Sequence, residues 1–164
     1  MAGELREKIQ EALKAAMRAH ETLRVSTLRM MIARLKELDI AARPKGVAAV
    51  PDEEIVVMLR SMVKSRRESE ALYRKGNRPD LADKESEEIA IIDSFLPQTL
   101  GGAALESAIA VAIRETGAAS VKDMGKVMSA LKASYGSALD MAATSALIKA
   151  KLASFGFIRP AATN

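Results

Sequence analysis

The chain has 164 residues, a formal net charge of +4 at pH 7 and no cysteine. The absence of cysteine excludes disulfides, a thiolate nucleophile and thiolate-ligated metals, and the single histidine, His20, leaves any transition-metal site to carboxylates. We therefore expect neither a metal nor a cofactor.

The N-terminal segment, residues 1–17, carries charges every few positions and lacks the apolar core of a signal peptide. Apolar residues recur at helical spacing in this segment and again in residues 26–40, which predicts two amphipathic helices. No apolar run in the chain reaches the roughly 20 residues that span a bilayer. We expect a cytoplasmic protein with no membrane segment.

A third and a fourth helix are predicted before the middle of the chain. Two prolines and a glycine interrupt the helical pattern in residues 42–51, and Asp52 with two glutamates then supplies negative charge for a helix start. Gly76 is suited to the C′ position that ends this third helix. Pro79 is suited to the first turn of a fourth helix.

The strongest break in the chain comes at Pro97, followed by Gly101 and Gly102. We place a domain boundary there, which separates an N-terminal helical domain, residues 1–96, from a C-terminal helical domain, residues 97–164. No segment shows the sustained alternation of a half-buried strand. The predicted fold class is all-α, with an N-terminal four-helix region followed by a small three-helix domain.

Local signals divide the C-terminal domain into three helices. Gly117 is expected to end the first helix. Ser120 is a good N-cap for the second helix, and Asp123 can return a hydrogen bond to the cap's own N–H, as in a capping box. Gly136 is expected to end the second helix, and Asp140 can cap the third.

No catalytic constellation is readable in the sequence. A Ser–His–Asp triad would have to use His20, which lies between two predicted helices among charged residues and is better read as a solvated loop residue. Glu87 and Glu88 resemble an acid/base pair, but adjacent residues on a helix point about 100° apart. We therefore interpret the chain as a binding protein, with an enzyme as the remotest hypothesis.

Basic side chains gather on the third helix. Residues 60–78 hold seven basic and two acidic residues, a balance of +5, whereas residues 79–93 hold one basic and six acidic, a balance of −5. Five of the basic residues recur near one helical face and could follow a phosphate backbone: Arg60, Lys64, Arg67, Arg74 and Arg78. The alternative is that this basic ridge pairs with the acidic fourth helix folded back across Gly76.

The second C-terminal helix contains a glycine where helices disfavour one. Gly125 lies in the predicted second turn, where it costs roughly 1 kcal/mol relative to alanine. It either lets the backbone approach an RNA phosphate or sugar, or permits a tight crossing with another helix. The RNA-binding candidates of this domain are Lys122, Gly125, Lys126, Lys132, Lys149 and Lys151.

Three runs of the sequence closely resemble the YqeY family. They are STLRMMIARLKELDI, KSRRESEALYRKGNRPDLADKESEEIAIIDSFLPQTL and GAASVKDMGKVMSALK. The most specific pieces are Tyr73 to Leu81, Phe95-Leu96-Pro97 and Lys122 to Met128. The resemblance covers nearly the whole chain and implies a small two-part helical protein.

The C-terminal half of this family is similar to the tail domain of GatB, a subunit of glutamine-dependent aminoacyl-tRNA amidotransferases. The resemblance implies kinship with a domain that contacts tRNA, and it maps Gly125 and Lys126 onto the glycine-containing helix of that tail. Carbon–nitrogen ligation with glutamine as nitrogen donor would then be an activity of the relatives. The implied partners are tRNA or another structured RNA, and the tRNA-dependent amidotransferase or aminoacyl-tRNA synthetase machinery.

One loop departs from the family pattern. Relatives typically place a basic residue after a glycine here, whereas this chain reads Gly136-Ser137-Ala138-Leu139-Asp140. The missing charge weakens the expected phosphate contact. Two function classes therefore stay open: a non-catalytic RNA-binding module, and a protein-interaction adaptor that docks through its methionine-rich C-terminal helices.

Overall fold

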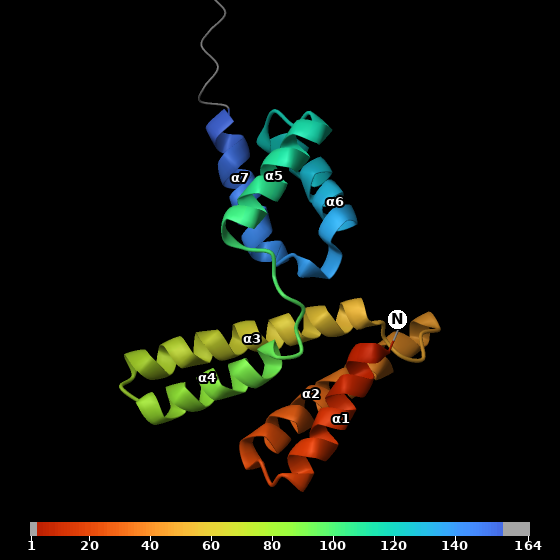
Figure 1. Cartoon of the computed structure of the whole chain (residues 1–164), viewed down its shortest axis with the longest axis vertical. Helices are drawn as coiled ribbons and strands as arrows, with labels where there is room; N and C mark the ends of the chain where they lie inside the picture. The colour runs from red at the N-terminus through yellow and green to blue at the C-terminus, as the bar shows by residue number, and fades with distance from the viewer. Residues whose placement is uncertain (1–2, 156–164) are drawn as a thin grey trace, which may run out of the picture. The chain divides into compact units, whose positions relative to one another are not determined.

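A computed structural model describes residues 3–155, and every regular element among them is helical (Figure 1). The predicted fold class is therefore confirmed. The seven α-helices are α1 Glu4–Arg18, α2 Thr22–Ala42, α3 Asp52–Lys75, α4 Pro79–Asp93, α5 Gly102–Thr116, α6 Met124–Tyr135 and α7 Met141–Phe155. Short 3₁₀ turns occupy Arg43–Lys45, Val121–Asp123 and Gly136–Ala138.

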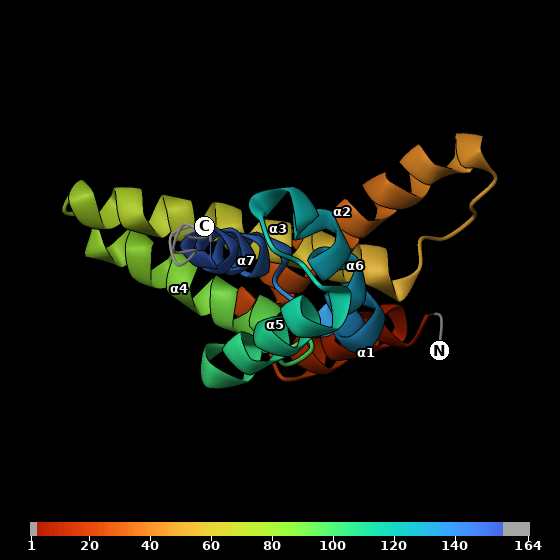
Figure 2. The same ribbon diagram turned by 90° about the horizontal axis from the view of Figure 1, so that it is seen from above.

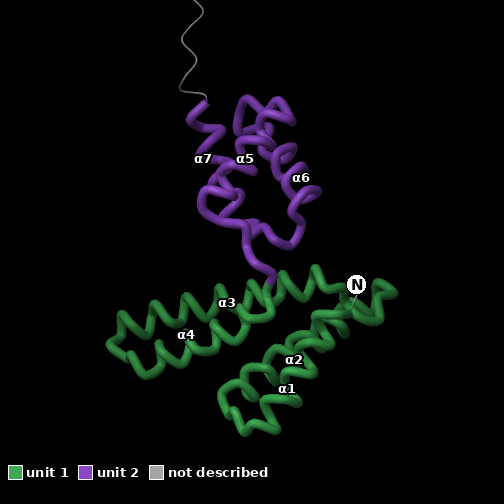
Figure 3. The backbone as a smooth tube through the Cα atoms, in the orientation of Figure 1, with its two compact units in different colours: residues 1–96 green, residues 97–164 purple. Residues whose placement is uncertain are grey.

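The chain forms two compact units, residues 1–96 and residues 97–164 (Figure 3). In the first unit, α3 and α4 lie side by side as an antiparallel hairpin in both views, and α1 packs on α2 as a second hairpin (Figures 1 and 2). The core where these hairpins meet is aliphatic. Its fully buried side chains include Ile9, Leu28, Met31, Ile55, Leu59 and Ile92.

The second unit has its own core, to which α5, α6 and α7 all contribute. Its fully buried side chains include Ile109, Val127, Leu131, Leu139, Ile148 and Leu152. Asp140 caps α7 as predicted, because its Oδ1 accepts hydrogen bonds from the N–H groups of Ala142 and Ala143 at 3.1 and 3.2 Å. Gly117 and Gly136 end α5 and α6 with positive φ angles of 66° and 53°.

Two helix ends differ in detail from the prediction. Gly76 follows the last residue of α3, but its φ is −80°, and the left-handed residue is Asn77, with φ of 54°. Asparagine tolerates this conformation better than most residues do. At the start of the sixth helix, the capping signal begins a 3₁₀ turn over Val121–Asp123, so that Gly125 lies in the first turn of α6.

Two carboxylates join segments of the first unit that are distant in sequence. Asp52, the first residue of α3, accepts hydrogen bonds from the N–H groups of Gly3 and Leu5 at 3.1 and 3.2 Å, and thus caps α1. Asp39 on α2 accepts two hydrogen bonds from the Arg6 guanidinium, at 2.8 and 2.9 Å. Within residues 3–155, no helix combines the length and apolar character needed to cross a membrane.

Candidate nucleic-acid interface

The solvent-facing side of α6 carries three of the six predicted RNA-binding residues of the second unit. Val127 and Leu131 are buried on its inner side, whereas Gly125, Lys126 and Lys132 are exposed. Gly125 and Lys132 are seven residues apart and therefore lie on one side of the helix. The helix contains no acidic residue. Its outer side therefore presents positive charge next to a backbone segment without a side chain.

Gly125 does not pack against another helix in the part of the chain that the structure describes. A Cβ atom placed on Gly125 would meet nothing within 4 Å outside the local helix backbone in the described chain. The hypothesis of a tight crossing with another helix is therefore wrong for residues 3–155. The first turn of α6 is open to solvent at this residue, which leaves the backbone accessible to a partner.

Asp123 adds one negative charge beside this surface. Hydrogen bonds from the backbone N–H groups of Ala119 and Ser120, at 2.9 and 3.2 Å, hold the pKa of the Asp123 carboxyl below its ordinary value. The bond from Ser120 is the predicted return bond of the capping box. The Lys126 ammonium lies 3.9 Å from Asp123 and is 70% exposed. This loose pair leaves Lys126 accessible.

The two lysines of α7 do not join a common surface. Lys149 and Lys151 are two residues apart, which separates them by about 200° around a helix. Lys149 is exposed, whereas Lys151 is partly buried and donates a hydrogen bond from Nζ to the backbone oxygen of Glu106 on α5, at 3.4 Å. The structure therefore separates the six candidates into a group on and beside α6 and two lysines on different sides of α7.

The two ends of the basic ridge differ in whether their side chains form ion pairs. Arg74 contacts Glu70 at 2.8 Å and Asp83 of α4 at 3.4 Å, and Arg78 contacts Asp80 at 3.0 Å. These pairs support the alternative interpretation for the C-terminal end of the ridge.

The other end of the ridge differs. Lys64 and Arg67 are exposed and form no ion pair within residues 3–155, while Arg60 is half-buried and has interactions of its own. Among the ridge residues, Lys64 and Arg67 are therefore the cations that the described structure leaves accessible to another molecule.

Among the described residues, the most buried ion pair between the basic and acidic helices involves a residue outside the predicted ridge. Arg66 donates from Nε to Glu88 Oε2 at 2.9 Å, and the two side chains are 14% and 9% exposed. Helical spacing in the sequence could have indicated that Arg66 faces inward. Arg66 comes four residues after Met62 and three after Val63, which belong to the core, so it lies on the same side of α3. Glu88 therefore forms a structural ion pair with Arg66, which does not support the acid/base pair with Glu87.

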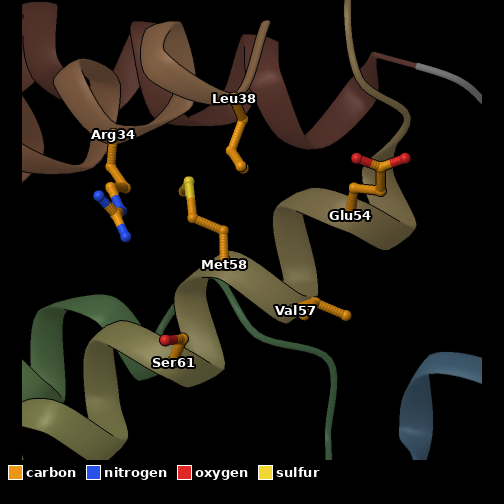
Figure 4. Close-up of a pocket in the computed structure, with 6 residues that line it drawn as sticks. All are labelled: Arg34, Leu38, Glu54, Val57, Met58 and Ser61. Carbon is orange, nitrogen blue, oxygen red and sulfur yellow. The ribbon is translucent and has the colours of Figure 1, made fainter. Parts of the chain in front are cut away.

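A cavity of about 300 Å³ between α2 and α3 has a lining of mixed charge (Figure 4). The Met58 side chain points into the space between Arg34 and Leu38 (Figure 4). Arg34 is already paired with Glu37 at 2.8 Å. Such a lining does not favour a polyanion, and it offers no nucleophile held by a base.

His20 is exposed in the turn between α1 and α2, with φ of 55°. Among residues 3–155, no group of histidine, aspartate and glutamate side chains could hold a metal ion.

The loop that lacks the family's basic residue forms the 3₁₀ turn Gly136–Ala138 and leads into the Asp140 cap. The backbone N–H of Leu100 donates to Ala138 O at 2.8 Å. The described loop therefore has a structural role, and the cations nearest to it in sequence are on α6.

Residues 6–152 match the family model described as "Yqey-like protein". "Altered inheritance of mitochondria protein 41, mitochondrial" of Vanderwaltozyma polyspora is 33% identical over 89 residues, which cover 54% of this chain and 46% of that protein. The protein of the same name from Lachancea thermotolerans is 34% identical over 91 residues, covering 55% and 46%.

An uncharacterized protein of Schizosaccharomyces pombe is 26% identical over 90 residues, covering 55% of this chain and 70% of that protein. The chain spans a little under half the length of the first two relatives. Their names place those two proteins in mitochondria and state no biochemical activity.

Proposed function

Because the chain belongs to the Yqey-like protein family, we propose that it is a non-catalytic module that binds tRNA or another structured RNA. The observation that carries this proposal is the outer side of α6, a helix without acidic residues, where the exposed Lys132 lies on the same side as the bare backbone of Gly125 and the exposed Lys126 follows that glycine directly. Lysine contacts to phosphates release counterions and supply most sequence-independent affinity. The resemblance to the GatB tail domain supports the same partner.

In the proposed contact, the residues on and beside α6 have different roles. Gly125 allows a sugar or phosphate edge to approach the first turn of α6, while the exposed Lys126 and Lys132 neutralise neighbouring phosphates. Lys122, in the preceding 3₁₀ turn, extends the surface. Association with tRNA-dependent amidation machinery follows from the family resemblance and belongs to this proposal, as does a cytoplasmic location, although the fungal relatives are named mitochondrial.

The adaptor hypothesis has less structural support. Met124 and Met128 are half-buried and pack against the core of the second unit. They are therefore core residues and do not form a continuous exposed methionine surface. An apolar docking surface would also respond weakly to salt, which separates the two functions experimentally.

Reversing two charges on α6 tests the proposal. Lys126→Glu with Lys132→Glu is expected to weaken binding to total tRNA by roughly tenfold or more, because a hydrogen bond to a charged group contributes about 1.5–3 kcal/mol. The salt dependence should also fall, since each lost phosphate contact lowers the salt slope by about one. Filter binding at two ionic strengths measures both effects.

The matched control reverses two exposed lysines of the first unit, Lys36→Glu with Lys45→Glu, which changes the net charge equally. Equal losses in both double variants would mean that only the net charge matters. Unchanged affinity in the α6 variant, with circular dichroism showing an intact fold, would remove the proposed site.

Gly125→Ala separates backbone access from helix stability. The substitution meets no steric obstacle in the described chain and should raise the free energy of unfolding by about 0.5–1 kcal/mol, through helix propensity. If RNA approaches this backbone closely, the added methyl group should weaken binding although the protein becomes more stable. Chemical denaturation and filter binding on the same samples check this opposition. A more stable variant with full affinity would contradict the close approach.

A further inference from the structure

A pocket in the second unit lies between α5 and α7 and is distinct from the α6 surface. It has a volume of about 380 Å³, within the usual range for small-molecule sites. Its apolar part comes from Ala110, Ile113 and Phe155, and its charged part from Arg114 and Lys151. We call it the α5–α7 pocket. An apolar pocket bordered by cations suits a flat ring that is joined to an anionic group.

Among residues 3–155, no carboxylate forms a salt bridge with either cation of this pocket. Arg114 is exposed and forms no ion pair within residues 3–155. Lys151 donates to the neutral backbone oxygen of Glu106, at 3.4 Å, and the Glu106 carboxylate forms no salt bridge with it. A phosphate next to the pocket would therefore find two available positive charges.

The negative end of the α5 dipole is partly covered. The last carbonyls of a helix carry partial negative charge and would oppose a bound anion. Here the N–H of Gly117 bonds to Arg114 O at 3.4 Å, and the N–H of Ala118 bonds to Ile113 O at 3.2 Å. With these two carbonyls occupied, Arg114 and Lys151 determine the sign of the local charge.

Phe155 supplies an accessible aromatic ring. Its side chain is 51% exposed, in a chain where aromatic residues make up only 3% of the sequence. Exposed aromatic residues beside arginine and lysine are the usual means of binding unstacked bases, because every base offers a flat face. Bases that are paired in a duplex are already stacked on their neighbours. The exposed ring of Phe155 therefore suits an unpaired base that is turned out of the RNA duplex.

We infer that the α5–α7 pocket holds one unpaired base of the bound RNA, stacked on Phe155, with Arg114 and Lys151 on the adjoining phosphates. This inference rests on the proposed function and deepens it. It assigns to the second unit a preference for bulged or looped RNA over continuous duplex. It also adds Arg114 and Phe155 to the residues that bind RNA.

The experiment compares two hairpin RNAs that differ only in one nucleotide. In the first RNA, 2-aminopurine stands as an unpaired bulge, and in the second it is paired. The full chain should quench the bulged fluorophore through stacking and should bind the bulged hairpin more tightly. Phe155→Ala should abolish the quenching and weaken binding of the bulged hairpin by roughly 5- to 150-fold, which is the usual effect of one base–aromatic stack.

Salt dependence separates the roles within the pocket. Phe155→Ala should leave the salt slope unchanged, because stacking releases no counterions. Arg114→Gln and Lys151→Gln should each lower the slope by about one. Val111→Ala is the matched control, since Val111 is an exposed apolar residue of α5 outside the pocket. This variant should bind both hairpins like the unmodified chain.

The outcomes distinguish this inference from the proposed function. Equal, salt-dependent binding of both hairpins, with no effect of Phe155→Ala, would overturn the inference and leave RNA binding in place. No binding of either hairpin or of tRNA would overturn both. Quenching and a bulge preference that both vanish only in the pocket variants would support the inference.

Discussion

Replacing Arg66 with methionine is expected to lower the free energy of unfolding by about 3–5 kcal/mol near neutral pH. Arg66 holds the Glu88 carboxylate at 2.9 Å where α3 meets α4, and both side chains are largely buried. Methionine keeps most of the side-chain volume but removes the charge, so Glu88 would stay buried without its partner. Burial and then the nearby Glu88 raise the pKa of Glu85, while Arg66 and Lys84 act against this rise, so loss of Arg66 would remove one of the two cations that oppose it.

Urea denaturation followed by circular dichroism measures this loss. The matched control is Arg67→Met, because Arg67 is the next residue on α3, is exposed and forms no ion pair among the described residues. Its effect should stay within about 0.5 kcal/mol. Adding Glu88→Leu to Arg66→Met should restore most of the stability, since an apolar pair avoids the desolvation cost. Similar losses for Arg66→Met and Arg67→Met would show that the ion pair is not a structural contact.

Asp39→Asn is expected to lower the free energy of unfolding by about 2–3 kcal/mol near neutral pH, because hydrogen bonds to charged groups contribute about 1.5–3 kcal/mol. The Asp39 carboxylate accepts two hydrogen bonds from Arg6 and one from the backbone N–H of Val50, at 2.9 Å. It thereby joins α1, α2 and the segment before α3. Asparagine would turn an N–H donor toward the guanidinium and lose the bidentate pair.

The pH dependence gives this prediction a distinctive signature. The hydrogen bond from Arg6 lowers the pKa of Asp39 below its ordinary value of 3.8. The stability that Asp39 contributes is therefore present above this value and is lost as the pH falls through the lower pKa of the folded state. The difference between the original chain and Asp39→Asn should accordingly shrink in acid. Denaturation curves at pH 7 and near pH 3 test this trend.

Glu37→Gln is the control for Asp39→Asn. Glu37 is on the same helix and pairs with Arg34 at the same distance of 2.8 Å, but both side chains are more than 60% exposed. Exposed pairs of this kind contribute about 0.5 kcal/mol or less. If the two substitutions cost the same, burial would not be the reason for the importance of Asp39.

The residues around Gly125 show how far sequence patterns reach into the candidate site. The hydrogen bond that Asp123 accepts from the N–H of Ser120 was predictable because capping partners are three residues apart. The exposure of Gly125 was not, since the same glycine suits a helix crossing and an open surface equally well. Similarly, Lys149 and Lys151 carry the same charge, but the sequence does not show which of them contacts a neighbouring helix. That depends on how α5 packs beside α7.

The sequence by itself determined the all-helical fold class and most helix ends, such as those at Pro79, Gly117 and Asp140. These features depend on neighbours within about four residues, where spacing and backbone preference act directly. Only the tertiary structure decided that Asp52 caps α1 and that Arg114 shares a pocket with Phe155 of α7. Such contacts join residues about 40 to 50 positions apart. Their formation depends on how the helices pack, which local periodicity does not specify.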